Sequence, residues 1–193
     1  MSGVAALVLA GGAGRRMGGV DKTLLDVAGR RMIERVIAAL DARHIAISAN
    51  DDPARFAALG LPVLPDGEFV GQGPLAGVLA GLDWAAELGA DVLLTAPGDT
   101  PFVPRGLAAA LAPAPACAAS NGRAHHLVAL WPVACRDALR QVLSAPGRRD
   151  VVSFARRIGM RRVDFPVAKW DPFLNVNTLD DLAAARAIAE GKT

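Results

Sequence analysis

The amino-acid sequence predicts a single α/β domain with a mostly parallel central sheet that carries helices on both faces. Apolar, strand-like runs alternate with segments whose apolar residues recur at helical spacing, which is the pattern of βαβ units. Of the 193 residues, 52% are hydrophobic and 21% are charged, as in a globular protein with one core. We therefore expect residues 1–193 to form one domain.

The expected elements follow from local patterns along the chain. Strands are expected over 4–10, 45–49, 62–65, 91–96, 127–131 and 162–166. A first helix is indicated by one apolar face, formed by Met32, Ile33, Val36, Ile37 and Leu40. A short second helix has Asp52 as its cap, Pro53 at its first position and Gly60 near its end. A third helix begins at Pro74, buries Leu75, Leu79, Leu82 and Ala86, and stops at Gly89; another is expected over 103–111.

The first strand leads directly into a loop, residues 11–22, that contains five glycines and three cationic side chains, Arg15, Arg16 and Lys22. Glycines allow backbone N–H groups to approach an anion closely, and the cations add fixed positive charge. A buried strand that feeds such a loop is how α/β proteins build a phosphate site. The alternative for a bare glycine pair is an ordinary turn with solvated arginines.

Two common phosphate motifs do not fit this loop. The dinucleotide fingerprint would begin at Gly12, but Met17 occupies its last glycine position, and the P-loop requires a lysine directly after a glycine. The string LAGGAGRRMGGVDKTLL instead resembles the signature loop of nucleotidyltransferases with a Rossmann-like domain. It resembles the molybdenum cofactor guanylyltransferases in particular. The resemblance implies that the nucleotide is bound by Leu9, Ala10, Gly11, Gly12, Gly14, Arg15 and Lys22, and that Arg15 and Lys22 act in catalysis.

A stiff turn with one carboxylate, Asp99, follows the strand 91–96 between two prolines. From the residues alone, Asp99 fits two interpretations equally well: a Mg²⁺ ligand beside substrate phosphates, or an Asx-turn or cap ahead of the helix 103–111. The turn is similar to the metal-binding turn of the same family. The resemblance implies that Asp99 is catalytic, contacts the nucleotide and binds Mg²⁺.

Four other residues stand at positions that resemble nucleotide contacts of the family. Gly73 and Pro74 open a helix whose first N–H groups suit an anion, although an ordinary helix entry is the alternative. Asp66 follows the third strand, and its alternative is a solvated loop residue. Ser48 stands where the family often has an asparagine that contacts guanine, with Asn50 nearby to replace it. This departure leaves a cytidylyltransferase that uses CTP as an alternative to the use of GTP.

The segment F-L-N-V-N-T near the end of the chain also resembles the family. Asn175 and Asn177 alternate, so in an extended segment their amides face the same way. Thr178 and Asp181 form a near-capping box for a last helix. Backbone capping is the alternative role of the asparagines. The resemblance implies that the first half of the chain binds nucleotide and that Asn175 and Asn177 bind the pterin.

The implied reaction is transfer of GMP from GTP to the terminal phosphate of molybdopterin, most naturally in its molybdenum-bound form. Pyrophosphate leaves, and other molybdenum-cofactor assembly proteins, acceptor molybdoenzymes or their chaperones are the implied protein partners. The alternatives are a nucleotidyltransferase for a sugar phosphate or another cofactor, and a non-catalytic nucleotide-binding regulatory module. A nicotinamide-dependent oxidoreductase is disfavoured because Met17 breaks its fingerprint.

Composition and charge exclude other classes. A net charge of +2 argues against a dedicated nucleic-acid binder, and no apolar run is long enough for a membrane span. Arginines follow the N-terminal apolar run, which is the wrong order for an export signal, and we expect a cytoplasmic protein with Cys117 and Cys135 as buried thiols. His125 and His126 are expected to have surface or structural roles. The pairs Arg148-Arg149 and Arg156-Arg157 fit either a solvated face or a docking patch.

Overall fold

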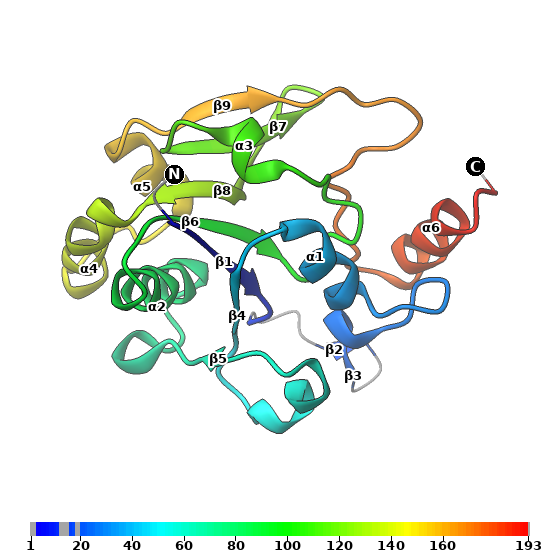
Figure 1. The fold of residues 1–193 in the computed structure, drawn as a ribbon, viewed down its shortest axis with the longest axis horizontal. Coiled ribbons are helices and arrows are strands. Elements are labelled where there is room, and N and C mark those ends of the chain that lie inside the picture. Colours follow the sequence, from blue (N-terminus) through cyan, green and yellow to red (C-terminus); the bar gives the residue numbers. More distant parts are fainter. Residues whose placement is uncertain (1–2, 12–15, 18–19, 193) are drawn as a thin grey trace.

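The centre of the molecule is a seven-stranded sheet in the order β5-β4-β1-β6-β8-β7-β9 (Figure 1). The computed structural model describes residues 3–11, 16–17 and 20–192. β1 pairs in parallel with β4 and β6, whereas β8 runs antiparallel to both β6 and β7. The predicted mostly parallel sheet is therefore confirmed. The strands are β1 (Gly3–Leu9), β4 (His44–Ser48), β5 (Val63–Leu64), β6 (Ala90–Pro97), β7 (Ala116–Ser120), β8 (Arg123–Pro132) and β9 (Arg161–Asp164).

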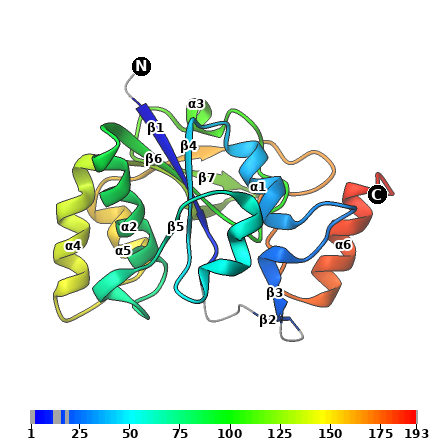
Figure 2. The ribbon, with the colours of Figure 1, turned by 60° about the horizontal axis from the view of Figure 1, so that its bottom comes forward.

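Helices cover both faces of the sheet, as predicted. Figure 2 shows α2 (Pro74–Glu87), α4 (Arg136–Ser144) and α5 (Val151–Arg157) on one side and α1 (Met32–Leu40) on the other. The 3₁₀ segment η2 (Pro53–Leu59) and α3 (Leu107–Leu111) pack on the same side as α1. Along β1, side chains alternate between the two cores: Val8 packs towards α1 and Leu7 towards α2.

The apolar faces expected for the first two long helices are confirmed in outline. In α1, Ile33, Val36 and Leu40 are buried in the core shared with η2 and α3. In α2, Leu75, Leu79 and Leu82 are buried, and Ala85 rather than Ala86 completes the face. Gly89, whose φ is +69°, follows the end of α2, as expected of a residue that leaves a helix in the left-handed region.

Several predicted boundaries are wrong by a few residues, each for a local reason. The helix expected over 103–111 contracts to α3 because Pro104 disfavours helical backbone before it and Gly106 takes a φ of +71°. The helix after Asp52 is a 3₁₀ helix, although Asp52 caps it and Gly60 ends it as expected. The strand expected over 127–131 extends back to Arg123, and the one expected over 162–166 is β9, which begins at Arg161 and ends at Asp164.

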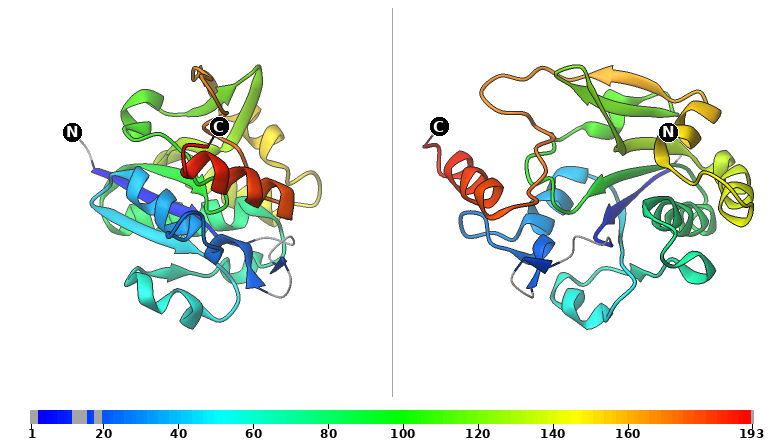
Figure 3. Two further views of the ribbon diagram at one scale, coloured as in Figure 1. Left: turned by 90° about the vertical axis from the view of Figure 1, so that its right-hand side faces the viewer. Right: turned by 180° about the vertical axis from the view of Figure 1, so that it is seen from behind.

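The end of the chain returns to its beginning through α6 (Leu179–Ala189). Figure 3 shows α6 beside the segment that contains β3 (Val20–Asp21) and α1. A small third core joins them, in which Val176 and Leu182 pack against Val27 and Met32. β3 pairs with β2 (Arg16–Met17), and the short 3₁₀ segments are η1 (Lys22–Leu24), η3 (Gly67–Phe69) and η4 (Val133–Cys135). In the described part of the chain, no helix is both long and apolar enough to cross a membrane.

Candidate active site

A pocket opens at the carboxyl ends of β1 and β6. The sheet order places β4 on one side of β1 and β6 on the other, so the connections that leave these strands diverge there. Ligands of open α/β sheets bind at such a point. The pocket is lined by Leu9, Ala10, Gly11, Asp21, Lys22, Thr23, Pro74, Pro97, Asp99, Leu127 and Asn175.

Lys22 occupies the centre of the polar contacts around this pocket. Its Nζ lies 2.5 Å from Asp99 Oδ2 and donates a 2.7 Å hydrogen bond to Asn177 Oδ1. The side chains of Lys22 and Asp99 are only 15% and 12% exposed, so water screens their attraction weakly. The predicted loop lysine and strand-end carboxylate therefore meet in space.

Local hydrogen bonds fix the backbone that carries Lys22. Asp21 caps η1: its Oδ1 accepts from the backbone N of Thr23 at 3.0 Å and from Thr23 Oγ1 at 2.7 Å. The other oxygen of Asp21 pairs with Arg55 Nε at 3.1 Å, which ties the start of η1 to η2. Asp21 is not among the site residues expected from the sequence, although the pattern D-x-T is a recognisable capping signal.

Asp99 lies at the carboxyl edge of the sheet, as expected, and does not cap a helix. Helix α3 begins only at Leu107, after Gly106, so the capping alternative is wrong. The Asp99 carboxylate contacts side chains instead: Lys22 Nζ, and Thr100 Oγ1 at 3.5 Å. Its backbone oxygen accepts from Val176 N at 2.9 Å, which joins the turn to the end of the chain.

Asn175 and Asn177 reach the same place from the far end of the chain. Asn175 Oδ1 accepts from Thr100 Oγ1 at 3.2 Å, and Asn177 Oδ1 accepts from Lys22. Val176 between them is fully buried, whereas the amides on either side contact Thr100 and Lys22, in keeping with the expectation that the two amides face the same way. The expected capping box also forms, because Asp181 accepts from the backbone of Asn177 and Thr178 and donates from its own N to Thr178 Oγ1. The hydrogen bonds that the Asp181 carboxylate accepts from Asn177 and Thr178, that from Asn177 N first, lower its pKa.

Beside the pocket, a second polar group joins three of the predicted nucleotide positions. Asn50 Nδ2 donates to Asp66 Oδ2 at 2.6 Å, and Asp66 N donates back to Asn50 Oδ1 at 2.8 Å. Ser48 is buried at the end of β4 and faces Gly77 of α2, where Asp66 Oδ1 also approaches. Gly11, which lines the pocket, adjoins Ser48 and Asn50.

The remaining predicted nucleotide positions divide into described and undescribed residues. Gly73 takes a φ of +85° and precedes Pro74, the first residue of α2, so the expected helix start is confirmed and faces the pocket. Gly12, Gly14 and Arg15 lie outside the described residues.

The donor set fits a hydrated divalent cation that arrives with phosphates. Among the described residues, no group of three or more His, Cys, Asp or Glu side chains could hold a metal ion. Asp99 and Asp21, however, both line the pocket. One or two carboxylates together with substrate phosphates and water are what Mg²⁺ commonly uses in nucleotide enzymes.

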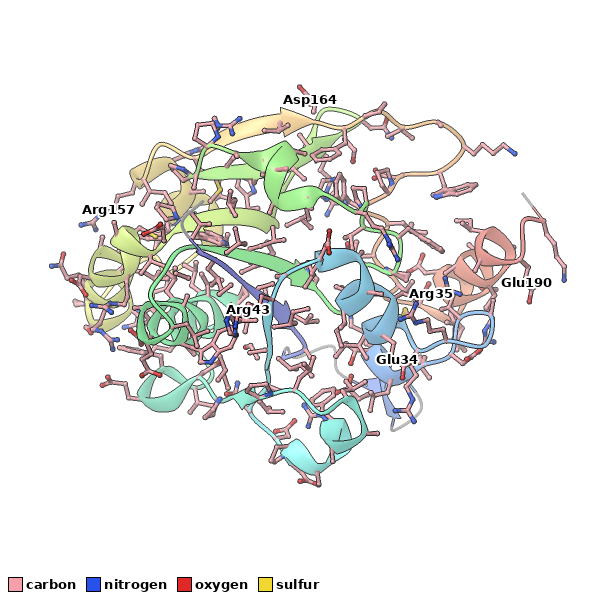
Figure 4. All side chains as sticks on the ribbon, in the orientation of Figure 1. Glu34, Arg35, Arg43, Arg157, Asp164 and Glu190 are labelled. Carbon is pink, nitrogen blue, oxygen red and sulfur yellow. The ribbon has the colours of Figure 1, made fainter. Side chains whose placement is uncertain are left out.

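The histidines, arginine pairs and cysteines named from the sequence are not among the residues that line the pocket. His125 and His126 are part of β8, with His125 beside Ser120 and Phe173. Arg149 donates to Gln72 Oε1 at 2.8 Å, and Figure 4 shows Arg157 at the opposite edge of the view from Glu190, which directly follows α6. Cys117 and Cys135 are buried free thiols, as predicted. Burial raises the pKa of both thiols, that of Cys135 to about 11.

Fold and pocket together define a class, the nucleotidyltransferases. The family described as MobA-like NTP transferase domain matches residues 6–160. A solved structure of molybdopterin-guanine dinucleotide biosynthesis protein A from Archaeoglobus fulgidus has the same fold, with a TM-score of 0.73, 24% identity, and coverage of 97% of this chain and 99% of that one. The fold is also that of a 2-C-methyl-D-erythritol 4-phosphate cytidylyltransferase from Thermus thermophilus, with a TM-score of 0.65, 20% identity, and coverage of 97% and 99%.

Curated relatives narrow the class. A molybdenum cofactor guanylyltransferase of Acidiphilium cryptum is 58% identical over 94% of this chain and 93% of that protein. Another, from Cereibacter sphaeroides, is 52% identical over 94% of this chain and 95% of that protein. The chain therefore belongs to the family of molybdenum cofactor guanylyltransferases.

Proposed function

We propose that the protein transfers GMP from GTP to the terminal phosphate of molybdopterin, in its molybdenum-bound form, and releases pyrophosphate. The observation that carries this proposal is Lys22, which lies between Asp99 and Asn177 at the end of the glycine loop. A cation held by a carboxylate and an amide can exchange both for phosphate oxygens when a triphosphate enters. The guanylyltransferase relatives, 43–58% identical over nearly the whole chain, support the choice of substrates.

The chemistry requires charge neutralisation more than proton transfer. The attacking group is a phosphate monoester, whose second pKa is about 6, so it is already ionised at neutral pH and needs no general base. The reaction needs alignment of the two substrates and cations around the triphosphate. We assign this role to Lys22 and Arg15, which hold the triphosphate and stabilise the departing pyrophosphate.

We further propose that Asp99 holds Mg²⁺ together with the nucleotide phosphates. When bound, the ion neutralises charge on the phosphate oxygens. Lys22 already lies 2.5 Å from Asp99, so the same carboxylate can keep the lysine and the ion beside one set of oxygens. Asp21 stays bonded to Thr23 and Arg55, a position that suits support of the loop.

The nucleotide and the pterin divide the pocket in this proposal. Leu9, Ala10, Gly11 and the helix start at Gly73-Pro74 face the phosphates and ribose, and the group formed by Ser48, Asn50 and Asp66 faces the base. Uncharged amides suit the polar edge of a pterin better than a triphosphate, which favours cations. Asn175 and Asn177 are therefore assigned to molybdopterin.

Pyrophosphate release tests the proposed function directly. The purified protein is incubated with GTP or CTP, with and without molybdopterin and with and without Mg²⁺. We expect release only with GTP, molybdopterin and Mg²⁺ together, and tighter binding of GTP than of CTP in titration calorimetry. Equal or reversed nucleotide preference would move the protein to the cytidylyltransferases, and release without molybdopterin would point to another acceptor.

The expected protein partners remain part of the proposal. They are molybdenum-cofactor assembly proteins and the acceptor molybdoenzymes or their chaperones. The expected compartment is the cytoplasm, in keeping with the two buried free thiols, Cys117 and Cys135.

A further inference from the structure

Ser120, His125 and Asp171 form a hydrogen-bonded cluster of side chains outside the pocket lining. Ser120 ends β7, His125 lies in β8, and Asp171 belongs to the long connection between β9 and α6. Ser120 Oγ lies 2.7 Å from His125 Nε2 and donates to both carboxylate oxygens of Asp171, at 2.9 and 2.8 Å. Ser120 is 1% exposed, so its hydroxyl depends on these two partners.

The direction of the hydrogen bonds follows from counting protons. A carboxylate only accepts, so the single hydroxyl proton of Ser120 is directed at Asp171. The Ser120 oxygen is then the acceptor for His125, which must carry its proton on Nε2. In a hydrolytic triad the serine instead gives its proton to the histidine, so this cluster does not activate Ser120 as a nucleophile.

The Ser120–His125–Asp171 cluster fixes one end of the segment that carries Asn175 and Asn177. Asp171 Oδ1 also accepts from Phe173 N at 2.8 Å. The Phe173 side chain is 2% exposed. The centroid of its ring lies 4.9 Å from that of His125 and 5.1 Å from that of Phe165. Asn175 follows two residues later, so little chain separates it from this fixed point.

The other end of the same segment is held at the pocket. Val176 N donates to Asp99 O at 2.9 Å, and the Val176 side chain is fully buried in the core shared with α6. Residues 171–177 are thus attached both to the β7–β8 pair and to the Asp99 turn. The amides of Asn175 and Asn177 stand between or next to these attachments.

We infer that Ser120, His125 and Asp171 are positioning residues that hold Asn175 and Asn177 in place for the second substrate. This inference rests on the proposed function in one respect, the assignment of the asparagines to molybdopterin. Aligned binding groups accelerate a transfer reaction only when their supports are rigid, because a displaced group no longer meets the substrate. The Ser120–His125–Asp171 cluster acts through residues 171–177 and does not touch the substrate.

The test combines variants of the Ser120–His125–Asp171 cluster with three readouts. Ser120→Ala, Asp171→Ala and His125→Leu break it, whereas His125→Gln keeps an N–H donor close to the position of Nε2. Asp164→Ala, at an exposed position in β9, is the matched control. Steady-state kinetics give KM for molybdopterin at saturating GTP, and calorimetry gives Kd for GTP. Hydrogen–deuterium exchange of the Phe173 and Val176 amides reports on the segment without any substrate.

We expect the three disruptive variants to raise KM for molybdopterin on the order of tenfold, as for loss of a hydrogen bond to a charged group. Kd for GTP should change less than about twofold, exchange at Val176 should accelerate, and His125→Gln should behave like the unmodified protein. Unchanged exchange and unchanged KM in Asp171→Ala would overturn the inference. Equal losses for both substrates would also overturn it, because they would indicate general destabilisation.

Asn175→Ala, measured in parallel, separates this inference from the proposed function. If Asn175→Ala leaves KM for molybdopterin unchanged while Asp171→Ala accelerates exchange, the assignment of the asparagines to the pterin is wrong and the anchoring role stands. If Asn175→Ala raises KM for molybdopterin while Asp171→Ala changes neither this KM nor the exchange at Val176, the anchoring role is wrong and the assignment stands.

Discussion

Lys22 and Asp99 hold each other at a distance of 2.5 Å, each with most of its side chain removed from water. A pair in this setting costs desolvation energy, and removing one member leaves the other charge poorly compensated. Here Asn177 supplies a second acceptor for Lys22, so loss of the carboxylate does not strand the lysine completely. The pair is therefore better suited to binding phosphate than to stabilising the fold.

Asp99→Ala is expected to lower kcat on the order of 100-fold or more, because the carboxylate that we assign to Mg²⁺ is lost. The fold should persist, since the backbone bonds of the turn do not involve the side chain. Pyrophosphate release measures the loss, and circular dichroism checks the fold. Asp137→Ala, whose side chain in α4 is 77% exposed, is the control. Mg²⁺-dependent turnover close to that of the unmodified protein would refute the metal assignment.

Individual site residues can be predicted from the sequence only where a local pattern, such as a loop after an apolar strand, indicates them. Lys22 and Asp99 follow directly from loops after apolar strands, and the structure brings them together. Thr100 escapes such reasoning because it acts through a contact between distant segments, donating to Asn175, 75 positions away. The local pattern marks Asp21 as a cap, but only the fold shows that it also lines the pocket.

Among the elements, α2 approaches the sheet through glycines. A methyl group at Gly81 would lie 2.6 Å from Leu7 Cδ2 and 2.9 Å from Leu93 Cδ2, and one at Gly77 would overlap Ser48 Oγ. The closeness of helix and sheet sets where the start of α2 meets the pocket. It also sets how Ser48 and Asp66 lie against the helix.

Gly77→Ala is accordingly expected to destabilise the protein by about 1–3 kcal/mol through overpacking. The double variant Ser48→Ala/Gly77→Ala should recover part of this loss, because the nearest clashing atom is removed while Ser48 Cβ remains 3.3 Å away. Urea unfolding of the two single variants and the double variant gives the coupling. Strictly additive effects would show that Gly77 and Ser48 do not press on each other.

The segment with the two asparagines gives a second prediction for an element. Asn175→Ala and Asn177→Ala should weaken binding or turnover of molybdopterin, each by about 0.5–1.5 kcal/mol for a lost neutral hydrogen bond. Kd for GTP should barely change, because Asp99 still holds Lys22 in Asn177→Ala. Calorimetry with GTP and kinetics in molybdopterin provide the comparison. A large loss of GTP affinity with an intact fold would place the asparagines in the nucleotide site.

Elements with a clear period are predictable from the sequence, and those defined by partners are not. The apolar faces of α1 and α2 follow from spacing, and β1 and β6 from apolar runs. The residues of β8 do not by themselves determine that this strand is antiparallel, because its direction depends on its pairing with β6 and β7. The short α3 depends on Pro104 and Gly106, which override a run that otherwise favours a helix.

For the whole molecule, the half-buried histidines of β8 make stability depend on pH. Burial is the main cause that lowers the pKa of His125 and His126 below the ordinary value of 6.5; Asp171 opposes it at His125, and Arg162 and Arg156 reinforce it at His126. The folded protein therefore binds these protons more weakly than the unfolded chain does. The free energy of unfolding should be highest above about pH 6.5 and decline as the pH falls through the lower folded pKa values.

Urea midpoints at about pH 7.5 and about pH 5.5 measure this decline. His125→Gln and His126→Gln should each reduce the difference between the two midpoints, whereas His44→Gln, at an exposed position, should preserve it. A difference that survives in the double variant His125→Gln/His126→Gln would assign the pH dependence to other groups.

The contact between Lys22 and Asn177 spans 155 positions of the chain, and it has a consequence for biosynthesis. A ribosome delivers the glycine loop and the Asp99 turn long before it delivers the asparagines. Because a domain generally folds as a unit, the nascent chain cannot complete the pocket, which Asn175 lines, until residues 175–177 have been synthesised. If Asn175 and Asn177 bind the acceptor substrate, as proposed above, transfer activity should arise only when this final segment docks.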